Sequence, residues 1–389
     1  MESNQTLCSA AWLDLNIDFG KKKLRHCCKQ TFESFPSNLE NSFFNNSEII
    51  KGIRNDLIKG IEHPSCDHCW SSYKKTGTAF RDFKNKWKHI NDISNNVESI
   101  EVSLDNLCDM ACIYCDPEFS SRIAREVGSK DRVQTPNKDD INKFIDYLAY
   151  DATIGDNIQI VFLGGEVTYS KNFFYFVETM LENITLKNKK VNFSFMTNGN
   201  TNEKNMNKII SLLDLLPVNW NISIGISNES MGEVAEYVRH GLDWNVFDKN
   251  FKYWANHERI HCITVSPTPC IFTLKHMPSF FEYCVDVIKN AKNTKIAIFG
   301  NWVEWPEILD PKHLDISYKK YVEHAMQIVT NAEKVYDDKD QIAHTRNWLD
   351  RLHARIGTGN LNLDKVDKFI NFKAENKKDK NLYKLRKFI

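Results

Sequence analysis

Three cysteines lie within eight residues in the segment CDMACIYC, which runs from Cys108 to Cys115. Cys112 stands between them, so the cysteines are separated by three residues and then by two. Thiolates bind zinc and iron–sulfur clusters, but a structural zinc site uses four protein ligands. Since neither a histidine nor a fourth cysteine is near in the sequence, a metal centre held by this loop would keep one open position.

A second set of cysteines precedes this loop, within residues 1–96. Turn-rich segments and short helical patterns give this region too little apolar surface for a large core, so a bound metal would help to stabilise it. The Cys-x2-Cys pair of this set also has the spacing of a zinc knuckle, and a structural zinc site is therefore one alternative. The five cysteines are Cys8, Cys27, Cys28, Cys66 and Cys69.

The composition indicates the cellular compartment of the protein and argues against some classes of binding partner. Of the 389 residues, 42% are hydrophobic, and Lys+Arg and Asp+Glu both number 51. A net charge of zero gives no support to binding of nucleic acid or of an anionic membrane. Neither a secretory signal nor an apolar run of roughly 20 residues is visible. We therefore expect a cytoplasmic protein, in a reducing compartment where clustered cysteines bind metal more often than they form disulfides.

The elements that must position these cysteines begin near residue 97. Short strand-like runs alternate with helical patterns in which apolar residues recur at three- and four-residue spacing. This alternation predicts an α/β fold with a parallel sheet. Six units are too few for an eight-fold barrel, so we predict a partial (β/α)6 TIM-type barrel with its site at the C-terminal ends of the strands. The predicted strands are 99–104, 158–163, 191–196, 220–226, 261–266 and 295–299.

We predict three regions along the chain. A small Cys-rich domain occupies residues 1–96, the partial barrel residues 97–300, and a mainly helical region residues 301–389. The last of these ends in the basic stretch KKDKNLYKLRKFI. We interpret this stretch as a solvated, partly frayed helix rather than a nucleic-acid-binding arm.

The cysteine loop resembles that of the radical S-adenosylmethionine (radical SAM) superfamily. The matching features are the Cys-x3-Cys-x2-Cys spacing, its place directly after the first barrel strand, and the aromatic Tyr114 before the last cysteine. The resemblance implies a [4Fe-4S] cluster held by the three cysteines, with S-adenosylmethionine on the open iron and Tyr114 against its adenine. A zinc site or a fortuitous cluster of cysteines is the alternative.

Later strand ends carry further matches to this superfamily. Gly164, Gly165 and Glu166 follow the second strand and match the Gly-Gly-Glu motif, which meets the methionine amino group of the cofactor. Glycines at a strand end let the backbone approach a ligand closely. Val167 replaces the usual proline. Thr197 begins a Thr-Asn-Gly turn after the third strand, as is common in the superfamily.

The fourth strand end matches less completely. Ser227 and Arg239 stand where relatives contact the ribose and the methionine carboxylate, so the resemblance implies the same contacts here. Glu229 and Ser230 replace an Asp-Gly pair, which puts the contacts of that loop in doubt. A surface salt bridge is the alternative role for Arg239.

The N-terminal cysteines resemble SPASM/twitch domains of the same superfamily, which hold an auxiliary iron–sulfur cluster. Such a domain usually follows the barrel, and here it precedes it. The resemblance implies a second [4Fe-4S] cluster, closed by four cysteines and therefore suited to electron transfer. The implied ligands are Cys8, Cys27, Cys66 and Cys69, with Cys28 as the alternative to Cys27 because adjacent strand residues face opposite sides.

The resemblance implies reductive cleavage of S-adenosylmethionine to a 5′-deoxyadenosyl radical that abstracts hydrogen from a substrate carbon. We expect the substrate to be a ribosomally made peptide or protein, which would gain a crosslink, a thioether or an epimerised residue. A sugar or amino-acid derivative is the alternative substrate, and a non-catalytic iron–sulfur or zinc-binding protein is the alternative function. The expected partners are an electron donor such as flavodoxin or ferredoxin and a separate leader-peptide-binding protein.

One further cysteine is a candidate for chemistry. Cys270 lies just past the fifth predicted strand, where barrel loops reach the site, and could return a hydrogen atom in an epimerisation. Its other interpretation is a buried thiol that packs as a small apolar side chain.

Overall fold

The computed structural model describes residues 6–77, 79–87, 89–129, 133–291, 295–332, 339–377 and 379–389. Within them one nine-stranded sheet has the order β3-β2-β1-β4-β5-β6-β7-β8-β9. Each strand from β4 to β9 pairs in parallel with the next, which confirms the predicted α/β fold with a parallel sheet. The strands are β1 Asp14–Asp18, β2 Lys23–Arg25, β3 Glu33–Ser34, β4 Val97–Ser103, β5 Ile154–Leu163, β6 Lys190–Thr197, β7 Asn221–Ile226, β8 Ile260–Val265 and β9 Lys295–Ile298.

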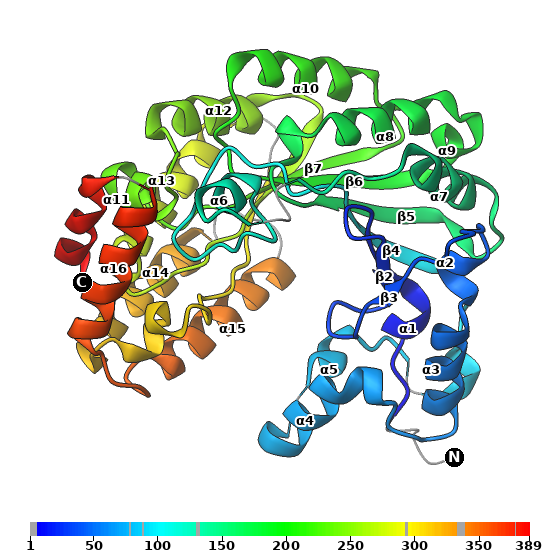
Figure 1. The fold of residues 1–389 in the computed structure, drawn as a ribbon, viewed down its shortest axis with the longest axis horizontal. Coiled ribbons are helices and arrows are strands. Elements are labelled where there is room, and N and C mark those ends of the chain that lie inside the picture. The colour runs from blue at the N-terminus through cyan, green and yellow to red at the C-terminus, as the bar shows by residue number, and fades with distance from the viewer. Residues whose placement is uncertain are drawn as a thin grey trace.

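Helices fill the crossovers between the parallel strands and form the outer layer of a curved molecule (Figure 1). Most of them begin at a side-chain cap, as at α7, where Asn137 accepts a hydrogen bond from the Asp139 backbone. The barrel helices are α6 Ser121–Glu126, α7 Lys138–Tyr150, α8 Lys171–Glu182, α9 Ile184–Asn188, α10 Glu203–Leu215, α11 Gly232–Val238, α12 Trp244–Asn256 and α13 Met277–Lys289.

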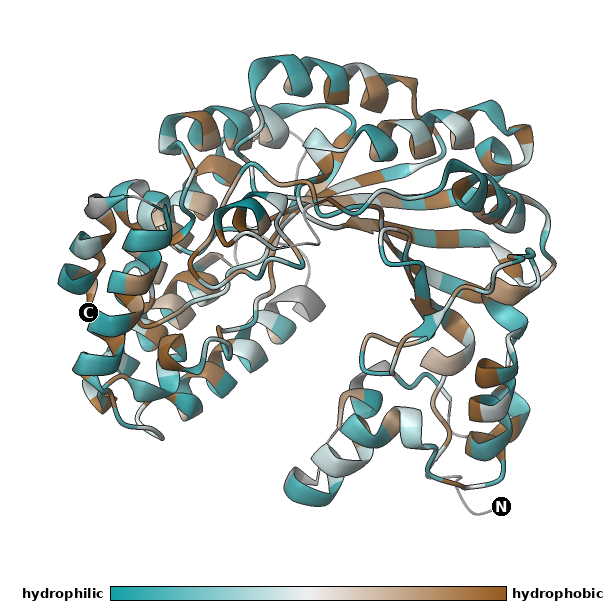
Figure 2. Cartoon of the chain, in the orientation of Figure 1, coloured by the Kyte–Doolittle hydropathy of each residue, from teal (hydrophilic) through white to brown (hydrophobic). Residues whose placement is uncertain are grey.

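The main core lies between the sheet and these helices. Residues on β6 alternate between buried and partly exposed, so one face of the strand packs on the outer layer. Phe173 of α8 contacts Phe162 of β5 and Phe195 of β6, with ring centroids 5.0 and 5.8 Å apart. Figure 2 shows the same partition, with apolar residues along the strands and polar residues on the outer faces of α10 and α12. This packing fixes the strand ends that carry the site.

The N-terminal region joins the barrel sheet rather than standing beside it. β1 pairs in parallel with β4, and the β1–β2 and β2–β3 pairs are antiparallel. Its helices surround a second, smaller apolar core that includes Trp12 and Trp70. The division of the chain at residue 96 stays a prediction. The helices are α1 Ala10–Leu13, α2 Phe43–Asn46, α3 Glu48–Ile58, α4 Asp67–Thr76 and α5 Phe80–Lys84.

The C-terminal region contains α14 Lys319–Ala332, α15 Lys339–Arg355, α16 Leu363–Lys377 and the 3-10 helix η8 Lys380–Phe388. The interpretation of its last residues as a solvated, frayed helix is wrong. Leu382 and Leu385 are fully buried, and Phe388 packs its ring on Tyr237 of α11 at 5.9 Å. Apolar residues at three-residue spacing bury one face of η8, while Lys384 and Lys387 are exposed. Among the described residues, no helix is both long and apolar enough to cross a membrane.

Candidate active site

The three-cysteine loop follows β4 directly, at the C-terminal end of the parallel sheet. Cys108, Cys112 and Cys115 are each partly exposed. Met110 and Ile113, which lie between them, are buried. The loop is therefore anchored by its apolar residues, and its thiols remain at the border of the core and the solvent.

Backbone hydrogen bonds hold this loop against the segment that follows α11. The Ala111 N–H donates to the His240 carbonyl at 2.8 Å, and the Ile113 N–H donates to the Val238 carbonyl at 2.9 Å. These bonds fix the middle of the cysteine loop to a segment more than a hundred residues away. The position of Cys112 therefore depends both on the loop after β4 and on the segment after α11.

The thiols are ligands that suit a metal centre, and without a metal their burial keeps them protonated. Burial raises the pKa of Cys112 to about 12 and also raises the pKa values of Cys108 and Cys115. Metal binding would replace these protons, because the thiolate is the ligand. Among the described residues, no three His, Cys, Asp or Glu side chains form a group suited to one metal ion. This result does not argue against a cubane cluster, because its four irons hold the thiolate ligands farther apart than a single metal ion does.

The Gly-Gly-Glu segment after β5 packs directly on the start of the cysteine loop. The Gly165 N–H donates to the Asp105 carbonyl at 3.1 Å, and the Glu166 N–H donates to the Leu107 carbonyl at 2.6 Å. A Cβ atom on Gly165 would lie 2.3 Å from the Leu107 oxygen. Glycine is required here because the two backbones approach so closely.

The carboxylate of Glu166 connects the ends of two neighbouring strands, β5 and β6. Its Oε1 accepts from Thr168 and from the Thr197 hydroxyl at 2.8 Å, and its Oε2 accepts from the Asn198 N–H at 2.6 Å. Burial raises the pKa of Glu166 to about 7. A carboxylate has about four acceptor positions, and Oε2 uses only one of its two in these bonds. The side chain can thus bind one more donor, such as an ammonium group.

Asp109, inside the cysteine loop, was not predicted from the sequence. Its two carboxylate oxygens accept from the side-chain amides of Asn198 and Asn200, at 2.9 and 3.0 Å. Asn198 and Asn200 belong to the turn after β6, so this turn is hydrogen-bonded to the cysteine loop. The only sequence signal for Asp109 was its position between two predicted ligands.

Tyr114, Glu229 and Arg239 form a buried polar group beneath the cysteine loop. The Tyr114 hydroxyl donates to Glu229 Oε1 at 2.9 Å. Arg239 Nη2 donates to Glu229 Oε2 at 2.6 Å, and the Arg239 guanidinium lies 5.7 Å from the Tyr114 ring centroid. Glu229 is 0% and Arg239 5% exposed. The ion pair of Arg239 is therefore buried and not at the surface, and Glu229 takes part in it.

Ser227 and Cys270 lie at the ends of β7 and just beyond β8. Ser227 is partly exposed and its N–H donates to the Thr197 carbonyl at 2.9 Å, next to Glu166. Cys270 is fully buried in the main core, where its N–H donates to the Thr273 hydroxyl at 2.9 Å. The structure thus brings Ser227 to the same strand-end layer as Glu166, and it buries Cys270 in the main core.

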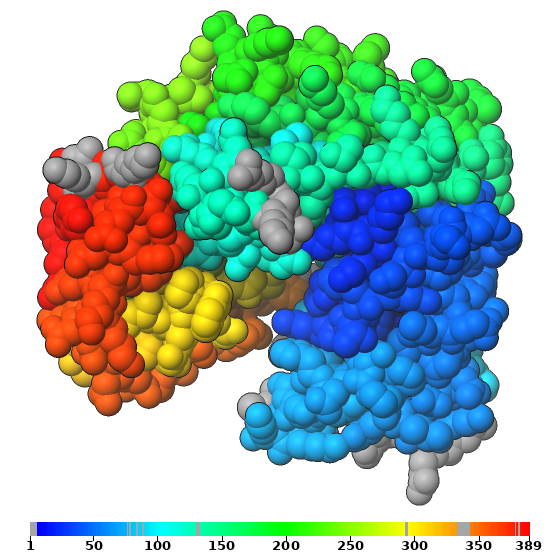
Figure 3. All heavy atoms as spheres, viewed as in Figure 1, coloured from blue at the N-terminus to red at the C-terminus, as the bar shows by residue number. Residues whose placement is uncertain are grey.

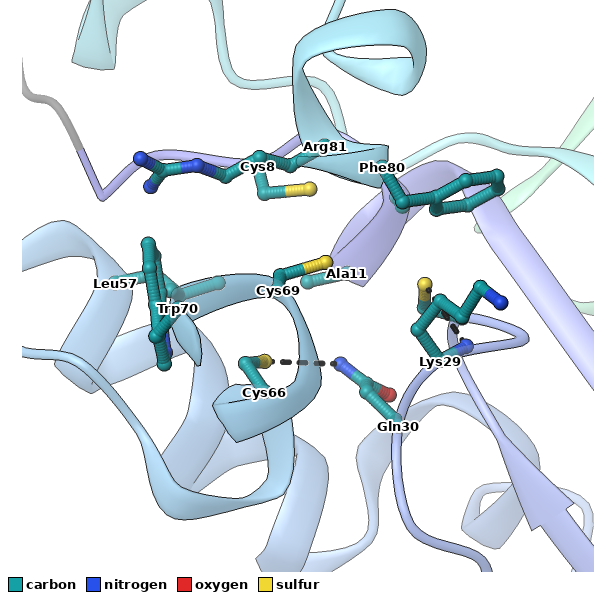
Figure 4. Close-up of a pocket in the computed structure, with 12 residues that line it drawn as sticks. Cys8, Ala11, Lys29, Gln30, Leu57, Cys66, Cys69, Trp70, Phe80 and Arg81 are labelled. Carbon is teal, nitrogen blue, oxygen red and sulfur yellow. Dashed lines mark hydrogen bonds between the residues drawn. The ribbon is translucent and has the colours of Figure 1, made fainter. Parts of the chain in front are cut away.

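A separate cavity in the N-terminal region gathers four cysteines. The close-up in Figure 4 shows the thiols of Cys8, Cys66 and Cys69 directed toward a common space between α1, α4 and α5. Cys27 is the fourth cysteine of the lining, and Cys28 is not among the residues that form it. The cavity thus gathers the four cysteines predicted as auxiliary ligands, and whether they bind a cluster stays a prediction.

Donors and cations surround these thiols. The Lys29 N–H donates to the Cys27 sulfur at 3.5 Å, and the Gln30 side-chain amide donates to the Cys66 sulfur at 3.8 Å. Lys29 and Arg81 also line the cavity. Four thiols with N–H donors and positive charges fit a negatively charged iron–sulfur cluster.

A shallow hollow on the surface lies beside the cysteine loop. It is lined by Asp109, Arg122, Arg125 and Glu126. Arg122 donates to the Asp109 carbonyl at 2.6 Å, and Lys377 of α16 forms a 2.8 Å ion pair with Glu126. The end of α16 therefore lies close to the cysteine loop.

Comparison with solved structures gives distant similarities of fold. The chain is similar to native anSMEcpe with bound AdoMet, at 16% identity and a TM-score of 0.44, over 60% of this chain and 60% of that chain. It is also similar to Streptococcus suis SuiB bound to precursor peptide SuiA, at 14% identity and a TM-score of 0.38, over 78% of this chain and 55% of that chain. The chain spans less than two thirds of the length of either structure. No protein-family model and no curated protein matches the chain.

Proposed function

We propose that this chain is a radical SAM enzyme. The observation that carries the proposal is the three-cysteine loop at the end of β4, whose backbone is bonded to the Gly-Gly-Glu segment at the end of β5. Cys108, Cys112 and Cys115 would hold a [4Fe-4S] cluster with one open iron for S-adenosylmethionine. When bound, cluster and cofactor together supply a 5′-deoxyadenosyl radical that can abstract hydrogen from a substrate carbon.

The residues around the loop have distinct roles in this proposal. Glu166 has an acceptor position left on Oε2 for the cofactor's ammonium group. Ser227 offers a hydroxyl to the ribose, and Tyr114 an aromatic ring to the adenine. Arg239 is bonded to Glu229, so we assign it first to positioning Tyr114 through that carboxylate and only then to the methionine carboxylate.

The N-terminal cavity is the second redox site of the proposal. Cys8, Cys27, Cys66 and Cys69 line it together, and four thiolates would close a [4Fe-4S] cluster completely. A closed cluster leaves no iron for a substrate, so its role is to transfer electrons. The enzyme would work in a reducing compartment such as the cytoplasm, with a flavodoxin or ferredoxin as electron donor.

A peptide or protein is the substrate class that we propose. Figure 3 shows the molecule hollowed between the N-terminal region and the C-terminal helices. The segment after β9 exposes two large aromatic side chains, Phe299 at 53% and Trp305 at 75%. Exposed aromatic side chains suit contact with an extended chain better than contact with a small molecule that must be enclosed.

Anaerobic reconstitution with iron and sulfide tests the enzyme class. With S-adenosylmethionine and a low-potential reductant, the protein should release 5′-deoxyadenosine, and Cys112→Ala should abolish this release. Cys262→Ser on β8, outside both cysteine sites, should retain it. Equal release from Cys112→Ala and the unaltered chain would contradict the proposal.

The substrate class needs a separate measurement. The neighbouring genes supply the candidates: a short open reading frame encodes a peptide, and sugar-biosynthesis genes indicate a small molecule. Release of 5′-deoxyadenosine should rise with the peptide and the peptide mass should change. A rise with a sugar or amino-acid derivative, and none with the peptide, would replace the peptide by the small-molecule alternative.

A further inference from the structure

We propose that Gln30 sets the reduction potential of the auxiliary cluster, through the hydrogen bond from its side-chain amide to the sulfur of Cys66. This inference rests on the proposed function, because it requires a cluster in the N-terminal cavity. It assigns Gln30 as a positioning residue for electron transfer and not as a ligand.

The orientation of the Gln30 amide follows from its other hydrogen bond. Gln30 Oε1 accepts from the His26 backbone N–H at 3.1 Å, so the oxygen side of the amide faces the hairpin. The amide nitrogen must then point the other way, where it lies 3.8 Å from the Cys66 sulfur (Figure 4). An exchange of oxygen and nitrogen would place an N–H against the His26 N–H, which is unfavourable.

The backbone of Gln30 is fixed as well. Its N–H donates to the Cys27 carbonyl at 3.0 Å, and its carbonyl accepts from Arg25 Nη1 at 3.3 Å. Gln30 is only 6% exposed. One residue therefore joins the hairpin that carries Cys27 to the helical turn that carries Cys66, with little freedom to move away.

The electrostatic consequence is a higher potential. Reduction adds one negative charge to the cluster, and an N–H that points at a sulfur ligand stabilises the more negative state. Apolar side chains form much of the cavity wall, including Leu57, Trp70 and Phe80. In such surroundings the effect of a nearby dipole is larger than in water.

Gln30→Met removes the amide N–H without adding charge, and Gln30→Glu keeps the shape of the side chain but adds a negative charge that lowers the midpoint as well. Both lack the amide N–H, and Gln30→Glu can still accept from the His26 N–H. They are made in a Cys112→Ala background, which removes the first cluster and leaves the auxiliary cluster as the source of the electron paramagnetic resonance signal. Both variants should lower the midpoint of a redox titration while keeping about four irons per chain.

Gln134→Met is the matched control, because the Gln134 amide donates to the Glu118 carbonyl away from the cavity. Its midpoint should equal that of the Cys112→Ala parent. An unchanged midpoint in both Gln30 variants would overturn the inference, as would loss of the cluster from both, which would make Gln30 a scaffold residue. If the Cys112→Ala parent itself binds no iron, the auxiliary cluster of the proposed function fails instead.

Discussion

The hydroxyl of Tyr114 donates a 2.9 Å hydrogen bond to Oε1 of Glu229, a carboxylate with no solvent exposure. Tyr114 belongs to the cysteine loop after β4, and Glu229 follows β7. Arg239 completes the group by an ion pair with the same carboxylate. The orientation of the residue before Cys115 is therefore set by a charged pair from the segment that follows β7, and this dependence can be tested.

Tyr114→Phe removes the donor and keeps the ring. We expect the free energy of unfolding to fall by about 1.5–3 kcal/mol, because a hydrogen bond to a buried charged group is lost. Denaturant unfolding measures the change. Tyr237→Phe is the control, since its hydroxyl donates at 3.0 Å to the exposed Glu233, and it should change stability by less than about 0.5 kcal/mol. Equal effects of the two substitutions would refute the role of Tyr114.

Arg239→Met leaves the buried Glu229 without its cationic partner. Breaking a buried ion pair from one side costs about 3–5 kcal/mol, because an uncompensated charge remains in the core. The exposed pair of Lys387 with Glu233, at 2.6 Å, supplies the control Lys387→Met, which should cost at most about 1 kcal/mol. A cost for Arg239→Met as small as that of the control would contradict the stabilising role of this buried ion pair.

The barrel and its cysteine loop could be predicted because their signals are local. Strand and helix periodicity follow from burial of one face, and this gave all six parallel strands from β4 to β9. The spacing of Cys108, Cys112 and Cys115 is equally local. The parallel pairing of β1 with β4 was not predicted, because it joins segments separated by the whole N-terminal region.

The polar contacts of the site could not be predicted from the sequence either, because they also join segments that are far apart along the chain. The bonds of Asp109 to Asn198 and Asn200 join loops from different crossovers. Periodicity indicates which residues face the core, but it carries no information on which side chains meet at the ends of neighbouring strands. The burial of Leu382 in the basic C-terminal stretch was missed because its charges dominated the interpretation.

Glu166 gives the site a dependence on pH. Its carboxyl has a folded-state pKa of about 7 against an ordinary value of 4.5. The raised pKa means that the protonated carboxyl contributes fully to the free energy of unfolding below pH 4.5, and that this contribution is lost as the pH rises through 7. Without S-adenosylmethionine, we expect the wild-type chain to lose on the order of 3 kcal/mol relative to Glu166→Gln between pH 4.5 and 8. A constant difference between the two proteins over this range would contradict the shifted pKa.

Cys27 and Cys28 are adjacent, and only Cys27 lines the N-terminal cavity. Cys27→Ser should therefore reduce the iron content after reconstitution from about eight to about four per chain, and Cys28→Ser should keep about eight. Iron and zinc analysis of both variants measures this. Loss of the second cluster from Cys28→Ser alone would reverse the assignment, and one zinc in place of four irons in the wild-type chain would replace the cluster by a structural zinc site.

Electrons for the proposed cluster at Cys108–Cys115 would have to arrive from outside, and the hollow beside the cysteine loop carries the exposed Arg125. The Asp109 carboxylate in this hollow is held by Asn198 and Asn200. The four residues that line the hollow carry two positive and two negative charges, and Lys377, which pairs with Glu126, adds one positive charge. We expect Arg125→Glu to slow 5′-deoxyadenosine release with an acidic flavodoxin by about tenfold at low ionic strength, because charge complementarity governs the rate of association.

The same variant should behave normally with dithionite, which needs no protein interface. Lys190→Glu is the control for charge, since this exposed residue begins β6 at the opposite end of the strands. It should leave the rate with flavodoxin unchanged. A loss of rate with both reductants would instead place Arg125 in the support of the cysteine loop, since its side chain also donates to the Ser121 carbonyl at 3.3 Å. An unchanged rate with flavodoxin would exclude this hollow as the electron-donor surface.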